Sequence, residues 1–92
     1  MIPEELMEEY RRSIPERLQE IERVIQDVNA DPTSQEKLAA LRFAVHKLAG
    51  NSGTFGYMEA SQLCRDLEQK ILQKAALDLG LFYQQLKKSF HS

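Results

Sequence analysis

Residues 33–56 read TSQEKLAALRFAVHKLAGNSGTFG and contain the strongest structural signal in the chain. The pattern Thr33-Ser34-Gln35-Glu36 is a capping box, in which a hydroxyl side chain and a glutamate three residues later satisfy free N–H groups at the start of a helix. Apolar residues then recur at intervals of three and four, on one helix face: Leu38, Leu41, Ala44, Val45 and Leu48. Gly50, Gly53 and Gly56 follow, and we expect these glycines to end the helix.

Similar patterns predict helices in the rest of the chain. A short first helix covers Ile2–Tyr10, and a second capping box at Ser13–Glu16 starts a longer helix that ends in the turn Asn29–Pro32. Two more helices follow, one from about Tyr57 and one from about Leu79. The apolar stripes of the three long helices are Ile14, Leu18, Ile21, Ile25 and Val28; Ala60, Leu63, Cys64, Leu67 and Ile71; and Leu79, Phe82, Leu86 and Phe90.

The composition agrees with a helical fold. The 92 residues include 4 glycines, 3 prolines and no tryptophan, which are few chain breaks for a β-rich protein that needs a turn about every 8 to 12 residues. Helices of this length with short connections pack as antiparallel neighbours. We therefore predict an all-α fold, an antiparallel up-down four-helix bundle with a short extra N-terminal helix as a lid. The bundle is predicted to form a single domain over residues 1–92.

Charge and composition exclude several classes of function. The formal net charge is -2, from 12 basic and 14 acidic residues without a basic stripe, which argues against nucleic acid as the main partner. No apolar run approaches the roughly 20 residues of a membrane span, and the acidic start lacks the basic region of a signal peptide. One cysteine and two histidines do not make a zinc site or an internal disulfide. We expect a cytoplasmic monomer with no bound metal.

His46 lies on the shoulder of the central stripe, where its imidazole is expected to reach solvent. One turn on are Ala49 and Gly50, and two turns on is Gly53, so the backbone beside the imidazole is bare. Because glycine inside a helix costs about 1 kcal/mol relative to alanine, close approach of another macromolecule to His46 is one reason for these glycines. Two simpler explanations stay open. His46 is a surface histidine without a role, or the glycines only form the C-cap of the helix and the turn after it. The spacing does not match a nucleotide-binding loop.

Residues 45–56, VHKLAGNSGTFG, resemble the signature of histidine-containing phosphotransfer (HPt) domains, H-x-L-K-G followed six residues later by a further glycine. Leu67-Glu68 matches the Leu-Glu pair that these domains have on the next helix. The sequence Gly-Thr-Phe-Gly-Tyr at 53–57 is similar to the corresponding domain of chemotaxis histidine kinases. The resemblance implies a phosphorelay carrier of two-component signalling.

The resemblance also implies roles for single residues. His46 would accept a phosphoryl group on Nε2 and exchange it with the aspartate of a response-regulator receiver domain, and Glu68 would orient the imidazole through Nδ1. The expected partners are a receiver domain, a histidine kinase, or both. The Mg²⁺ ion would belong to the receiver, so no cofactor is expected here. With no ATP site of its own, the domain is predicted to be a carrier and not an enzyme.

The sequence departs from the family at Ala49, where the usual lysine that faces the phosphate is missing. We hypothesise that Arg42 or Lys47 neutralises the phosphate instead. An exposed Phe43 is expected to dock the partner together with the small residues Ala49, Gly50 and Gly53; packing of Phe43 under the first helix is the competing reading. Two other functions stay open, a phosphoacceptor domain excised from a chemotaxis-type kinase and a non-catalytic helical adaptor whose histidine is inert.

Overall fold

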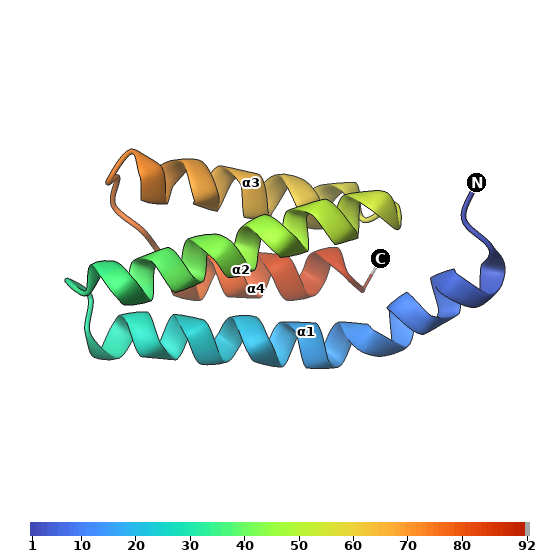
Figure 1. Cartoon of the computed structure of the whole chain (residues 1–92), viewed down its shortest axis with the longest axis horizontal. Helices are drawn as coiled ribbons and strands as arrows, with labels where there is room; N and C mark the ends of the chain where they lie inside the picture. The colour runs from blue at the N-terminus through green and yellow to red at the C-terminus, as the bar shows by residue number, and fades with distance from the viewer. Residues whose placement is uncertain (92) are drawn as a thin grey trace.

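The computed structural model describes residues 1–91, which form the four helices α1 (Glu4–Ala30), α2 (Gln35–Thr54), α3 (Met58–Leu72) and α4 (Leu79–Ser89). These residues contain no strand, so the prediction of an all-α fold is confirmed. Figure 1 shows the helices side by side along the long axis, with the chain direction reversing at each connection. The described helices include none that is long and apolar enough to cross a membrane.

The core consists of the predicted apolar stripes. The stripes of α1 and α4 are fully buried, and Leu41, Val45 and Cys64 at the contact between α2 and α3 have no exposed surface. Each buried large aliphatic side chain contributes about 1.5–3 kcal/mol relative to an exposed one. Leu38, Leu63 and Ile71 are half-buried and pack on the margin of this core. Since α2 packs most extensively on α3, residues of these two helices are held in a common register.

The separate short helix predicted at Ile2–Tyr10 was wrong, because α1 runs without a break from Glu4 to Ala30. Ser13 is not a helix cap; its hydroxyl donates to the Tyr10 carbonyl at 2.6 Å and accepts from Arg17 Nε at 2.8 Å. Pro15 therefore lies inside the helix, where its missing N–H and its ring favour a bend. Figure 1 shows the N-terminal part of α1 inclined to the rest of the helix and extending beyond the ends of the other helices.

Tertiary packing holds the two parts of α1 together across Pro15. The buried Tyr10 ring stacks on Phe55 with a centroid separation of 4.3 Å and lies 5.8 Å from Tyr57. Its hydroxyl donates to the Asn51 side-chain oxygen at the end of α2. Phe55 and Tyr57 thus serve packing, and this aromatic cluster offsets the cost of a proline in the helix interior.

The boundaries of α2 differ from the prediction at both ends. The N-cap is Ser34, whose hydroxyl accepts from the Lys37 N–H at 3.2 Å, one residue later than the predicted capping box. Gly50 and Gly53 do not end the helix, which continues to Thr54. Only Gly56 has the left-handed backbone, with φ of +88°, that glycine adopts just beyond a helix end.

Candidate functional site

His46 lies on the outer surface of α2, with 68% of its side-chain surface exposed. Its neighbours Ala44 and Val45 belong to the core, so the register of the helix turns the next residue toward solvent. This is the position that the shoulder of the apolar stripe predicts. The imidazole is therefore accessible to another molecule.

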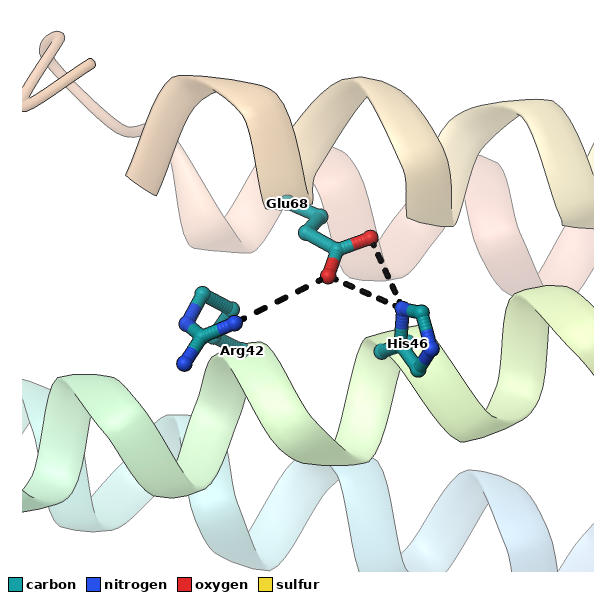
Figure 2. Close-up of polar contacts among 3 residues, drawn as sticks. All are labelled: Arg42, His46 and Glu68. Carbon is teal, nitrogen blue, oxygen red and sulfur yellow. Dashed lines mark hydrogen bonds and ion pairs between the residues drawn. The ribbon is translucent and has the colours of Figure 1, made fainter. Parts of the chain in front are cut away.

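Glu68 brings a carboxylate to the other side of this imidazole. Its oxygens lie 3.0 and 3.2 Å from His46 Nδ1, and only 16% of its side-chain surface is exposed. Figure 2 shows Glu68 descending from α3 toward the imidazole on α2. Leu67, the preceding residue, is buried between the helices, which places Glu68 at their seam. The carboxylate is thus held by packing, whereas the imidazole faces solvent.

This contact selects one form of the neutral imidazole. An ionised carboxylate only accepts hydrogen bonds, so Nδ1 has to donate and Nε2 retains its lone pair. Figure 2 shows Nε2 on the side of the ring away from Glu68. The arrangement offers an exposed nitrogen nucleophile oriented by a second side chain, which is the general pattern of an activated nucleophile.

The two predicted cations lie in different surroundings. Arg42 is one turn before His46, and its Nη1 lies 4.0 Å from a Glu68 oxygen, so the acid is shared between a cation and the imidazole (Figure 2). Lys47 places its Nζ 4.8 Å from the centre of the Phe43 ring. Arg42 is therefore on the Glu68 side of the site, and Lys47 is on the Phe43 side.

The predicted docking residues divide into two groups. The Phe43 side chain is 61% exposed, as predicted, and does not pack under the start of α1. Gly50 is exposed, and a Cβ added there would meet nothing within 4 Å. No internal contact requires glycine at this position. Phe43 and Gly50 thus form an open surface beside His46.

Ala49 and Gly53 make contacts inside the bundle, and a part in docking stays a prediction for both. Ala49 is 4% exposed, because position 49 faces α3. A Cβ on Gly53 would lie 3.0 Å from Ser61 Oγ, so this glycine permits the close approach of α2 and α3. Ser61 itself escaped the sequence analysis: its buried hydroxyl donates to the Ala49 carbonyl at 2.8 Å. The sequence offered one indication of a buried Ser61: it is a small polar residue directly after Ala60, which belongs to the apolar stripe.

A comparison with protein families matches residues 5–89 to the Hpt domain. The chain belongs to the Hpt domain family. Searches among curated proteins and among solved structures found no match. Hpt domains act in phosphotransfer during two-component signalling, as phosphocarriers that interact with receiver domains and kinases. The Hpt match covers α2, α3 and α4 and all of α1 except Glu4, and it includes both His46 and Glu68.

Proposed function

We propose that this Hpt domain carries a phosphoryl group on Nε2 of His46 and exchanges it with the aspartate of a receiver domain. The observation that supports the proposal best is the exposed imidazole whose Nδ1 contacts the part-buried Glu68 carboxylate. A surface histidine without a role needs no such partner. The proposed carrier is a monomeric, antiparallel up-down bundle that presents one face of α2 to the receiver.

The proposed transfer is a reversible exchange at phosphorus. The Nε2 lone pair attacks the phosphorus of the aspartyl phosphate, a nitrogen–phosphorus bond forms, and the bond from phosphorus to the aspartate oxygen breaks. The aspartate leaves as a carboxylate. The proton on Nδ1 stays there, hydrogen-bonded to Glu68, and the negative charge of the Glu68 carboxylate balances the positive charge that develops on the ring. Any Mg²⁺ required for the step belongs to the receiver in this proposal.

Two surfaces support the exchange in this proposal. Arg42, in place of the lysine that the family has at the position of Ala49, neutralises part of the phosphate charge from one side of His46. Phe43 and Gly50 dock the receiver, since an exposed aromatic ring supplies apolar contact area and the glycine lets the partner backbone approach. Lys47 contributes to this surface through its contact with Phe43.

The test is phosphoryl transfer to the purified domain. The domain is incubated with radiolabelled, phosphorylated receiver domains and, separately, with histidine kinases and ATP. We expect a label that is stable in base and lost in acid, as for phosphohistidine. His46→Gln abolishes it, and the matched control His91→Gln, at the other histidine of the chain, retains it.

Three other results would change the conclusion. Label that survives in His46→Gln would overturn the assignment of the acceptor. Label from kinase and ATP that no receiver can accept would favour the phosphoacceptor domain of a kinase. The absence of label with every donor would favour a helical adaptor.

A further inference from the structure

A cavity of about 620 Å³ lies at the end of the bundle where α1 leads into α2 and α3 leads into α4. This is the end opposite to the N- and C-termini in Figure 1. Its walls include the buried Val28 and Leu79 and the half-buried Leu38, Ile71 and Leu77. Volumes of about 300–1,000 Å³ are typical of sites for small molecules, and polar and apolar groups contribute about equally to the wall of this one.

The charged side chains that line this cavity have one sign. Arg42 and Lys74 line it, and its described lining contains no acidic residue, although the chain as a whole has a net charge of -2. Asp31, in the connection beside the cavity, is paired with Lys37 at 3.9 Å. A negatively charged group in the cavity would therefore meet two cations, of which Arg42 also lies 4.0 Å from the Glu68 carboxylate outside the wall.

Lys74 occupies a backbone position that favours glycine. The Lys74 N–H donates to the Ile71 carbonyl and the Ala75 N–H to the Lys70 carbonyl, the two bonds of a Schellman motif at the end of α3. Lys74 has φ of +56° and is the only non-glycine residue with positive φ in residues 1–91. A side chain is strained in this conformation. A lysine at this point gives up stability to place a cation beside the cavity, which is the kind of strain found at functional sites.

We infer that this cavity binds a small amphipathic carboxylate, with its apolar body against Leu38, Ile71 and Leu77 and its carboxylate between Arg42 and Lys74. The apolar side chains of the wall are the reason for an apolar ligand body. The two cations, one of them held at a strained backbone position, are the reason for a negatively charged head group.

The same ligand would act on the histidine site, a consequence that rests on the proposed function. Arg42 lines the cavity and also lies 4.0 Å from the Glu68 carboxylate. A carboxylate in the cavity attracts Arg42 away from Glu68, which leaves Glu68 to His46 alone and removes a cation from the phosphate position. The cavity would in this way slow phosphoryl transfer when it is occupied.

The binding test uses phenylbutyrate as the probe, titrated into the isotopically labelled domain and followed by NMR. We expect saturable shifts at Leu38, Ile71 and Leu77, with a Kd of about 1 mM or lower for a ligand of this size. Phenylbutanol and phenylbutylamine have the same apolar body without the carboxylate. They are expected to bind at least fivefold more weakly. Equal binding of either compound would overturn the inference.

Variants test the two cations. Lys74→Gly relieves the backbone strain, so it is expected to raise the midpoint of urea unfolding while weakening phenylbutyrate binding at least fivefold. Arg42→Gln is expected to weaken binding by a similar factor. The matched control Lys70→Gln, in the last turn of α3 and outside the cavity, is expected to leave binding unchanged. Unchanged binding in Lys74→Gly and Arg42→Gln would overturn the site.

The effect on His46 is read separately from binding. Saturation with phenylbutyrate is expected to shift the imidazole nitrogen resonances of His46 in the wild type and not in Arg42→Gln. Binding without this shift would contradict the coupling to His46. Because these measurements use no phosphoryl donor, their failure is distinct from a failure of the labelling experiment.

Discussion

The Glu68 carboxylate lies 3.0 Å from Nδ1 of His46, and the two residues differ sharply in exposure, 16% against 68% of the side-chain surface. A side chain fixed in the seam between α2 and α3 thus holds an exposed imidazole. Rotation of the ring would break this hydrogen bond. The direction of Nε2 is therefore established before any partner arrives.

Glu68→Gln tests the orienting contact. An amide can donate to Nδ1 and favour the tautomer in which Nε2 carries the proton. A hydrogen bond to a charged group contributes about 1.5–3 kcal/mol, so we expect phosphoryl transfer to slow by about 10- to 100-fold. Rapid-quench transfer kinetics give the rate, and imidazole nitrogen shifts give the tautomer. The control is Glu59→Gln, at an exposed position of α3; equal slowing in both variants would show a general effect on the helix.

Arg42→Ala and Lys47→Ala compare the two cations near His46. Arg42 lies on the Glu68 side of the site, whereas Lys47 is engaged with Phe43. An exposed charge contributes about 0.2–1 kcal/mol, so Arg42→Ala is expected to slow transfer a few-fold, and more than Lys47→Ala does. The measurement is the transfer rate at low and moderate salt, since screening reduces the difference. Unchanged rates in both variants would remove phosphate neutralisation from the mechanism.

Gly50→Ala and Gly53→Ala are expected to change stability in opposite directions. A Cβ at Gly50 meets nothing, so alanine raises the free energy of unfolding by about 0.5–1 kcal/mol. A Cβ at Gly53 would lie 3.0 Å from Ser61 Oγ, whose hydrogen bond to Ala49 it disturbs, and we expect a loss of about 1 kcal/mol. Urea unfolding measures both. A stabilising Gly53→Ala would mean that α3 can shift without cost.

Phe43→Ala tests the docking surface. The side chain is largely exposed, so the free energy of unfolding is expected to change by less than about 0.5 kcal/mol. Loss of an aromatic anchor weakens a complex by more than about 1 kcal/mol, and we expect the Kd for the receiver to rise at least fivefold. The matched control is Leu81→Ala on α4, also half exposed, which should leave the Kd unchanged. Calorimetry with a receiver domain distinguishes the two variants.

Alkaline pH is expected to destabilise the domain through two buried acids. Burial raises the pKa of Cys64 from 9.0 to about 12, and burial, partly opposed by the Arg17 charge, raises the pKa of Tyr10 from 10.0 to about 12. The unfolded chain releases these protons first, so the stability present below pH 9 falls as the pH rises toward 12. Cys64→Ala should show a shallower fall between pH 9 and 10 in urea unfolding. An identical slope would exclude the thiol as a cause.

The local pattern of apolar residues was sufficient to predict most of the helices and their buried faces. The stripes of α1 and α4 lie in the core as their spacing predicts, and so does the α2 stripe except for the half-buried Leu38, because a period near 3.6 residues places them on one face. The exposure of His46 follows from the same geometry. The boundary at Pro15 was not predictable in this way, since the packing of Tyr10 against Phe55 and Asn51 decides whether the helix continues.

The sequence by itself determined the helical class, the exposed histidine and, through resemblance, the family. The resemblance also implied that Glu68 orients His46, but only the tertiary structure gives the contact itself: Glu68 reaches His46 across 22 positions of sequence because α3 packs along α2. The same packing buries Ala49, reserves Gly53 for Ser61 and brings Arg42 to both Glu68 and the cavity. The physical reason is that periodicity fixes the face on which a residue lies, whereas the partner of that face depends on the register between helices.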